Sequence, residues 1–452
     1  MTADSRRDFD SILDANPLRP FQILIAALTA CVLLIDGFDT QVIALVAPDI
    51  AHQWNVPIPA FAIVFSVGLL GAVVGAAVFG TVGDRIGRKP TLLLTIALFG
   101  VLSLCTPLAG SLGELVAFRF GTGLGLGGAL PLVLAIVAEY VPPRMRSTVV
   151  SMVFCSFPLG IVVAGVVAFP IVAAFGWPAV FIAGGILPLV LLPFLAAFYP
   201  ESLRPLVARG DHAAIERLAA RLGFPGVRAE DIEVPAAPPR SPVRSLFSDG
   251  RTGGTLLIWG TLFLSLMLSY FLNSWITTLA RSAGFDGASA ILGSAALNLG
   301  GVVGAIVFGR LSDRYRASSV IGVGYLVGAL AIALIGQVSG SSALLLGVGL
   351  VAGFFAFGAQ LSTVALCANF YAASERGTGI GWGTAVGRVG GIVGPSIGGL
   401  LLVAGFGPPA IFIFAGVVSL GAAATALSMR FFTTNRDRAP HAAEVAKEFD
   451  AA

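Results

Sequence analysis

Four charged side chains lie inside stretches of sequence that are otherwise apolar: Asp36, Asp39, Arg119 and Arg388. If those stretches cross a membrane, each charge costs at least ~2.5 kcal/mol on insertion scales, and such residues are typically functional. Asp36 and Asp39 are three residues apart, so they share one face of a helix. Burial and mutual repulsion favour the neutral form of at least one carboxyl group, which predicts a proton carrier. A metal site and a role confined to helix packing are the alternatives, although the sequence offers no intramembrane His or second acidic pair to complete a metal site.

Arg119 begins a repeat in which Gly123 and Gly127 follow at intervals of four residues. Glycines at this spacing let a second helix backbone approach closely, and we expect Arg119 to face a partner acid. Gly123, Gly125 and Gly128 also fit the GxGxxG pattern of nucleotide-binding proteins. That pattern needs a preceding strand, whereas this one lies within an apolar stretch, so we predict no nucleotide and no other cofactor.

Arg388 is the best candidate to bind a carboxylate, because a guanidinium group pairs with one bidentately. A structural salt bridge to an acid is the alternative. An aromatic ligand would also need ring surfaces and a few hydrogen bonds. The candidates to supply them are scarce polar or amphipathic residues in apolar stretches: Tyr270, Asn273, Trp275, Asn298, Gln360 and Trp382. Each of these alone is more often a packing or interface residue than a ligand contact.

The elements that must position these residues are membrane helices. Of 452 residues, 56% are hydrophobic and 11% are charged, against ~25% charged in soluble globular proteins. This excludes a disordered or fibrous protein and almost any soluble enzyme, and the small net charge of +3 argues against nucleic-acid binding. A helix needs ~20 apolar residues to cross a bilayer. The chain has twelve such runs, at 21–48, 60–82, 90–109, 113–139, 147–174, 178–199, 255–280, 288–311, 318–338, 342–370, 377–403 and 409–431.

Two of these runs, 113–139 and 342–370, are long enough to need tilt or a kink, and Pro131 is a candidate kink site. Glu139, at the end of the first, is expected to join Arg144 and Arg146 in a charge network.

The basic residues predict the orientation of the chain. All but three of the 27 Lys and Arg residues lie in the termini or in the even-numbered loops, the exceptions being Arg119, Arg281 and Arg388. By the positive-inside rule, both termini and the long central loop lie in the cytoplasm. We therefore expect an integral protein of the plasma membrane, which is the inner membrane of a bacterium. Its parts are a cytoplasmic N-terminal segment (1–20), a six-helix bundle (21–199), a cytoplasmic central loop (200–254), a second six-helix bundle (255–431) and a cytoplasmic tail (432–452).

The central loop should contain one short helix, which Asp211 opens and which runs as far as Leu222. Beyond it, the sequence PAAPPRSP at 235–242 indicates an extended linker.

The two halves are related by an internal repeat. Residues 71–85 align without gaps to residues 300–314, and ten of the fifteen positions are identical. Repeated halves are typical of transporters, in which the substrate path lies between the halves near the membrane midplane. The sequence therefore predicts an all-α membrane protein with twelve helices in two pseudo-symmetric six-helix bundles.

The loop sequence GTVGDRIGRK at 80–89 resembles the signature of the major facilitator superfamily, with a degraded second copy at 309–316. The resemblance implies that Asp84 latches a cytoplasmic gate. The candidate gate residues in the two copies are Asp84, Arg85, Arg88, Asp313 and Arg314. A solvated positive loop is the alternative, and it would not explain the repeat.

Within that superfamily, the chain resembles the aromatic acid:proton symporter family. The specific match is Asp36-Gly37-Phe38-Asp39, and Pro200-Glu201-Ser202 is a broader one. The resemblance implies that Asp36 and Asp39 correspond to the essential acids of that family, and that Arg119 takes part in proton coupling.

The function that we predict is proton-coupled import of an aromatic carboxylate, such as a hydroxybenzoate, by alternating access. The expected partners are the aromatic acid, protons and the lipid bilayer, and we expect a monomer that is not an enzyme. The alternatives are a major facilitator carrier of another organic anion, a drug or metabolite efflux antiporter, a membrane-embedded enzyme, or a transporter-like receptor.

Overall fold

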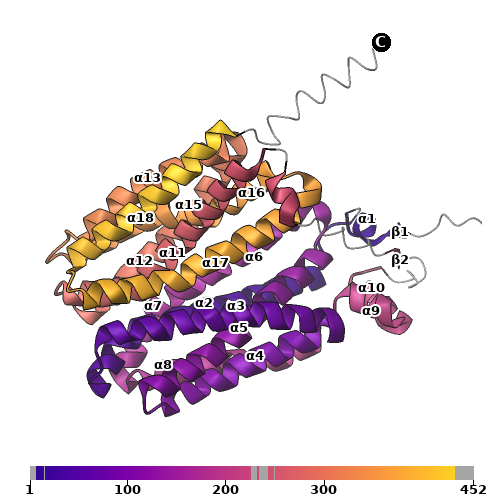
Figure 1. The fold of residues 1–452 in the computed structure, drawn as a ribbon. Helices are drawn as coiled ribbons and strands as arrows, with labels where there is room; N and C mark the ends of the chain where they lie inside the picture. Colours follow the sequence, from indigo (N-terminus) through magenta and orange to yellow (C-terminus); the bar gives the residue numbers. More distant parts are fainter. Residues whose placement is uncertain (1–6, 15, 225–231, 234–242, 249, 433–452) are drawn as a thin grey trace, which may run out of the picture. The chain divides into compact units, whose positions relative to one another are not determined.

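The computed structural model describes residues 7–14, 16–224, 232–233, 243–248 and 250–432. In this part of the chain, twelve helices are long and apolar enough to cross a membrane. The twelve predicted spans are confirmed, and most of their ends lie within a few residues of the expected ones. Figure 1 shows these helices as long rods. The linker predicted at 235–242 lies outside the described residues.

The chain divides into two compact units, the first of which comprises residues 1–46 and 67–237. The elements that lie wholly or mainly in it are β1 (Arg7–Asp8), α1 (Phe9–Asp14), α2 (Pro20–Trp54), α3 (Phe61–Ile86), α4 (Arg88–Cys105), η2 (Thr106–Leu108), α5 (Leu112–Tyr140), α6 (Pro143–Phe154), α7 (Ser156–Phe175), α8 (Pro178–Phe198), α9 (Leu203–Arg209), α10 (His212–Arg221) and β2 (Ile232–Glu233).

The second unit comprises residues 47–66 and 238–452, so it includes the end of α2, the short helix η1 (Ile58–Ala60) and the start of α3. Its further elements are η4 (Val243–Phe247), α11 (Thr252–Ser282), α12 (Gly287–Arg314), α13 (Ala317–Ile335), α14 (Ser342–Ala352), the π-helical turn η5 (Gly353–Phe357), α15 (Gly358–Ser362), α16 (Val364–Phe370), α17 (Ala373–Val403), α18 (Pro408–Ser428) and η6 (Met429–Phe431).

The sequence repeat produces the same helix contact in each unit. In unit 1, Gly71 and Gly75 of α3 lie against the backbone of Phe120 and Leu124 in α5. In unit 2, the repeat partners Gly300 and Gly304 of α12 lie against the backbone of Leu350 and Phe354. A Cβ atom at any of the four glycines would overlap a carbonyl oxygen, so only glycine permits this approach. The predicted pseudo-symmetry is thus visible in matched backbone contacts.

The run 342–370 is not one continuous helix. It is divided into α14, the π-helical turn η5 and the short helices α15 and α16. A π turn holds an extra residue in the helix and is common at functional sites. Gly353, which opens this turn, lies directly against the carbonyl group of Leu297 in α12, and the glycine makes that approach possible. In contrast, Pro131 lies inside α5 without interrupting it.

Small elements gather at one end of unit 1 (Figure 1). Asp211 caps α10 by accepting a hydrogen bond from the backbone N–H of Ala214 at 3.0 Å, so the predicted helix start is confirmed. Helix α9 was not expected from the sequence, and β1 pairs with β2 in parallel over two residues. Apolar side chains from α1, α9 and α10 join the buried cluster that contains Tyr140 and Tyr199.

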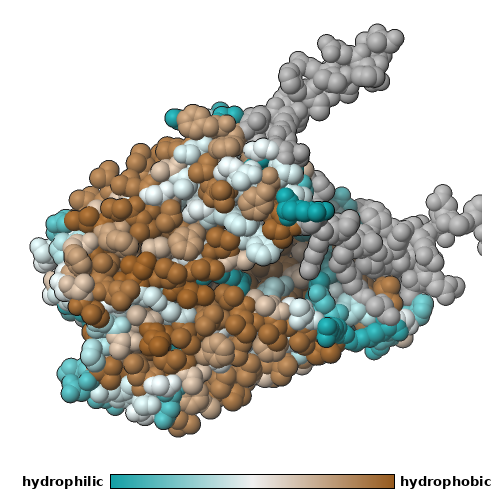
Figure 2. All heavy atoms as spheres, viewed as in Figure 1, coloured by the Kyte–Doolittle hydropathy of each residue, from teal (hydrophilic) through white to brown (hydrophobic). Residues whose placement is uncertain are grey.

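Apolar side chains cover much of the surface shown in Figure 2, and hydrophilic residues gather toward the ends of the helices. Large hydrophobic residues on the helix flanks are widely exposed, as at Leu330 (68%) and Leu400 (67%). Soluble monomers rarely expose large apolar patches. These flanks therefore fit a lipid environment.

We expect Gly127→Ala to lower the thermal unfolding midpoint of the detergent-purified protein. A Cβ atom at Gly127 would overlap the backbone of Ala72, so α3 and α5 would have to separate, and overpacking of this kind costs about 1–3 kcal/mol. Gly113→Ala is the matched control in the same helix, because nothing lies within 4 Å of its added Cβ atom. Equal unfolding midpoints for the two variants would contradict the close approach of α3 and α5.

Candidate functional site

A buried ion pair joins α2 to α5 in unit 1. Arg119 Nη1 lies 2.9 Å from Asp39 Oδ2, and Nη2 donates a hydrogen bond to the Asp39 carbonyl oxygen at 3.3 Å. The second carboxylate oxygen of Asp39 accepts a hydrogen bond from Ser103 Oγ of α4 at 3.2 Å. Asp39 is 1% exposed and Arg119 is 6% exposed. The acid that we expected opposite Arg119 is therefore Asp39.

Glycines beside the ion pair pack its helices closely against neighbouring helices. Gly123 of α5 lies against the backbone of Gly68 in α3, one turn beyond Arg119. Gly37, between the two acids of α2, lies against the backbone of Phe157 in α7. Side chains at these glycines would hold the helices apart, so the sequence DGFD combines a packing residue with two ionisable ones.

Asp36 has a different environment from Asp39, although both are on α2. It is 8% exposed, and Thr40 Oγ1 donates a hydrogen bond to its Oδ1 at 3.4 Å. Both acids are thus largely buried rather than open to lipid. Among the described residues, no group of three His, Cys, Asp or Glu side chains is placed to hold a metal ion.

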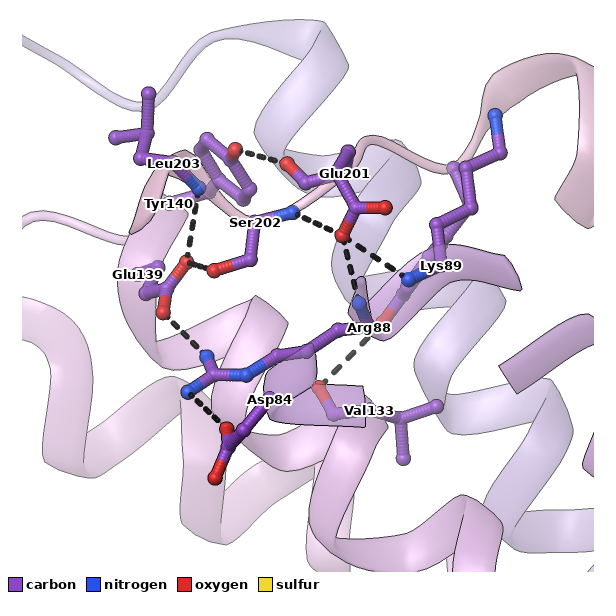
Figure 3. A network of polar contacts seen from close by, with 10 residues as sticks. Asp84, Arg88, Lys89, Val133, Glu139, Tyr140, Glu201, Ser202 and Leu203 are labelled. Carbon is purple, nitrogen blue, oxygen red and sulfur yellow. Dashed lines mark hydrogen bonds and ion pairs between the residues drawn. The ribbon is translucent and has the colours of Figure 1, made fainter. Parts of the chain in front are cut away.

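A second network of charges lies where α4 begins, and Figure 3 shows it. Glu201 Oε1 accepts backbone hydrogen bonds from Arg88 at 2.8 Å, Lys89 at 3.1 Å and Ser202 at 2.9 Å. A carboxylate at a helix N-terminus is stabilised by the free N–H groups and the helix dipole. Glu201 therefore fixes the start of α4.

Glu139 belongs to this network, but not with the partners that we expected. It pairs with Arg88 and accepts a hydrogen bond from Ser202 Oγ at 2.6 Å. Arg146 pairs instead with Asp10 at 2.7 Å, and Arg144 binds backbone carbonyl groups near the end of α1. Arg144 and Arg146, although near Glu139 in the sequence, contact α1 and the residues just after it. Glu139 pairs instead with Arg88, which is distant in the sequence.

Of the predicted gate residues whose side chains the structure describes, only Asp84 and Arg88 contact one another. Asp84 is exposed, and its Oδ1 lies 3.9 Å from Arg88 Nη2, at the limit of an ion pair. Arg85 and Arg314 are exposed. Asp313 lies in α12, but its side chain is not among those described. The sequence analysis named Glu201 only within the Pro200-Glu201-Ser202 match and did not predict that it belongs to this network.

In unit 2, Arg388 lies on α17 and is partly exposed. Among the described residues of unit 2, no acid forms an ion pair with it. The ring of Tyr270 on α11 faces Gly391, three residues beyond Arg388. Asn298 Nδ2 of α12 donates a hydrogen bond to Asn273 Oδ1 of α11 at 2.8 Å.

The three other candidates in this unit differ in burial and in their contacts. Trp275 is 1% exposed and donates its indole N–H to the Pro395 carbonyl oxygen at 3.0 Å. Trp382 is 45% exposed and stacks on Trp259, with ring centroids 6.2 Å apart. Gln360 is partly exposed in α15.

The family model of the Major Facilitator Superfamily matches residues 29–297 and 258–450. The chain is 36% identical to the gallate transporter of Pseudomonas putida, over 94% of this chain and 95% of that protein. It is also 36% identical to the 4-hydroxybenzoate transporter of Pseudomonas aeruginosa, over 90% and 92% of the two chains. The chain belongs to the Major Facilitator Superfamily, in the group of its aromatic acid transporters.

The fold comparison agrees with this membership. A bacterial homolog of the human lysosomal transporter Spinster, solved in an inward-facing and occupied conformation, aligns with a TM-score of 0.71. The sequences are 15% identical, and the match covers 92% of this chain and 98% of that one. At this identity the likeness concerns the fold alone. The predicted major facilitator fold is confirmed.

We expect Arg119→Leu to destabilise the protein more than the double variant Asp39→Asn/Arg119→Leu. Removing one partner of a buried pair costs about 3–5 kcal/mol, because the other charge stays buried without compensation. Thermal unfolding of the single and double variants measures the difference. Ser103→Ala is the control for loss of a hydrogen bond alone, at about 1 kcal/mol. A double variant no more stable than Arg119→Leu would contradict the pairing.

We expect Glu201→Ala to speed amide hydrogen exchange at Arg88 and Lys89, because both N–H groups lose their acceptor. Asp84→Ala is the matched control, since Asp84 is exposed and near the same helix end. Exchange measured by mass spectrometry on peptides covering 86–92 reports the change. Similar exchange in both variants would argue against a capping role for Glu201.

Proposed function

We propose that this chain imports an aromatic carboxylate, such as a hydroxybenzoate, together with protons, by alternating access. The observation that carries the proposal is the buried Asp39–Arg119 ion pair, with Asp36 one turn away on the same helix. The names of the relatives support the substrate class, because they are transporters of gallate and 4-hydroxybenzoate.

The ion pair offers a means of coupling. While Asp39 is ionised, it compensates the Arg119 charge inside the membrane-spanning helices. A proton that binds to Asp39 cancels the attraction, and Arg119 then carries an uncompensated charge in a poorly solvated site. Such a state favours rearrangement of α2 against α5, or the approach of an anion. Protonation and the binding of an anionic substrate thereby support one another.

Arg388 is the group that we assign to the substrate carboxylate. Its guanidinium group suits bidentate pairing, and among the described acids of unit 2 none forms an ion pair with it. Tyr270, near Gly391 on the facing helix, would supply a ring surface. Trp275 is left out of this site, because it is buried and its N–H group is already bound.

The gate that we propose includes the network around Arg88. Asp84, Arg85 and the corresponding region at Asp313 and Arg314 lie in the repeated loops, which the positive-inside rule assigns to the cytoplasm. Glu139 and Glu201 hold Arg88 through its side chain and its backbone, respectively. Release of these contacts would free the start of α4 during the transport cycle.

The driving force depends on how many protons accompany the substrate. One proton with one monoanion is electroneutral, so only the pH gradient drives uptake. A second proton would add the membrane potential, which is worth ~2.3 kcal/mol per charge per 100 mV.

The test is uptake of labelled 4-hydroxybenzoate into proteoliposomes with an imposed inward proton gradient. We expect wild-type protein to accumulate substrate, up to about tenfold per pH unit at one proton per substrate. Asp39→Asn should lose this accumulation, because the variant cannot bind and release the proton. Asp211→Asn is the matched control, an exposed capping acid that Asn replaces well.

Wild-type accumulation that persists unchanged with a protonophore would overturn proton coupling. Counterflow under the same conditions distinguishes symport from efflux antiport. Failure to move any aromatic acid would favour a carrier of another organic anion.

A further inference from the structure

A charged contact at one end of α11 has no part in the mechanism described above. Arg281, in the last turn of that helix, pairs with Asp49 near the end of α2, and both residues belong to unit 2. Arg281 Nη1 donates to Asp49 Oδ1 at 2.9 Å, and Nη2 donates to Oδ2 at 3.4 Å. A guanidinium group binds carboxylates in general in this two-point manner. Asp49 therefore occupies a position on Arg281 that suits the carboxylate of a ligand.

The pair is partly open to solvent, which allows Arg281 to exchange its partner. The side chains of Arg281 and Asp49 are 24% and 35% exposed. Arg251, at the other end of the same helix, pairs with Glu375, and those two side chains are only 11% and 12% exposed. Exposed ion pairs contribute little to stability. Replacing Asp49 by another carboxylate therefore costs less than separating the enclosed pair of Arg251 and Glu375.

Polar atoms without hydrogen-bond partners lie beside the pair. Thr277 and Thr278 are four and three residues before Arg281, so they share its face of α11. Among the side chains that the structure describes, the hydroxyl groups of both threonines and Nε of Arg281 are buried and form no hydrogen bond. Such groups destabilise the arrangement that encloses them. Movement of the end of α2 away from α11 would open all three to water or to a ligand, so the contact between these helix ends is only weakly favoured.

Arg281 carries the only strong positive charge at this end of unit 2. The segments that join its helices there contain no other Lys or Arg residue, and they are 47–66, 281–287, 336–341 and 404–407. Asp286, in the same connection as Arg281, is exposed and caps α12 by accepting hydrogen bonds from the backbone N–H groups of Ala288 and Ser289. An anion that approaches this end therefore meets one cation, and that cation already holds a carboxylate.

We propose that Arg281 is an outer binding site for the carboxylate of the transported acid, which replaces Asp49 on the guanidinium group. The positive-inside rule assigns this end of α11 to the outer face of the membrane. The inference rests on the proposed transport of aromatic acids, and it adds a first binding step that is separate from Arg388. Since one carboxylate leaves as another arrives, Arg281 is not left without a counter-charge.

The exchange also links binding to opening of this end of unit 2. Among the described residues, Arg281 and Asp49 form the only ion pair between the segment 47–66 and the rest of the unit. The other contacts of the segment are uncharged, such as the ring of Phe65 against Trp275 and the hydrogen bond from Ser66 to the Ile392 carbonyl oxygen. A carboxylate that displaces Asp49 thus removes the one charged contact that holds α2 to α11.

The experiment measures KM for downhill uptake of labelled 4-hydroxybenzoate in right-side-out and in inverted membrane vesicles, which present opposite faces of the protein. We expect Arg281→Gln to raise KM at the outer face by about tenfold or more, the effect of losing a charged hydrogen-bond donor. KM at the inner face should stay within about twofold of the wild-type value. Arg281→Lys keeps the charge but not the two-point geometry, so it should give a smaller rise. It replaces Arg281→Gln if that variant does not fold.

Asp49→Asn distinguishes a binding site from a purely structural contact. Both Arg281→Gln and Asp49→Asn break the ion pair, so a structural role alone predicts that they change KM in the same direction. If Arg281 binds the substrate, Asp49→Asn removes the competing carboxylate and lowers KM at the outer face, by up to about fivefold for an exposed pair. Asp286→Asn is the matched control and should leave KM unchanged, because it removes an acid from the same end and Asn also caps a helix well.

A rise of KM in both Arg281→Gln and Asp49→Asn would overturn the inference. An equal rise at the two faces in Arg281→Gln would also overturn it, as would a fall in Asp286→Asn as large as that in Asp49→Asn. KM does not depend on the amount of active protein, so partial misfolding does not imitate these effects. Absence of uptake of every aromatic acid from either face of wild-type vesicles would instead overturn the proposed function.

Discussion

The cost of burying charge in the membrane-spanning helices is the constraint on which the rest of unit 1 depends. Asp39 and Arg119 are almost fully enclosed, and each is tolerable only because the other lies 2.9 Å away. Helices α2, α4 and α5 must therefore meet at one level, where Ser103 binds the remaining carboxylate oxygen. A close contact of Gly125 in α5 with the backbone of Thr95 and Phe99 in α4 holds two of these helices together.

Charged side chains at the ends of the helices need no buried partner, because water can solvate them. Asp84, the acid of the repeated loop, is exposed and makes one marginal ion pair. Glu201 accepts three backbone hydrogen bonds and holds the start of α4. The strongest contacts of this network thus come from a residue outside the repeated loop. The gate that we propose needs an acid that exchanges partners, and exposure to water allows this at Asp84.

The two copies of the internal repeat make the same backbone contacts, but the two units carry different polar and charged side chains. Gly71 and Gly75 in unit 1 and their partners Gly300 and Gly304 in unit 2 support the same close helix approach. In unit 1, the helices enclose the ion pair of Asp39 and Arg119. In unit 2, the corresponding helices carry Arg388 and the hydrogen-bonded amides of Asn273 and Asn298 instead.

The sequence by itself determined the twelve spans, the repeat and the cap at Asp211, because hydropathy and capping depend on residues close together in the chain. Only the tertiary structure decided that Arg119 pairs with Asp39 and that Glu139 pairs with Arg88. Each of these partners is at least fifty residues away, and the register of one helix against another selects it. That register follows from many close backbone contacts acting together, and local patterns in the sequence do not contain it.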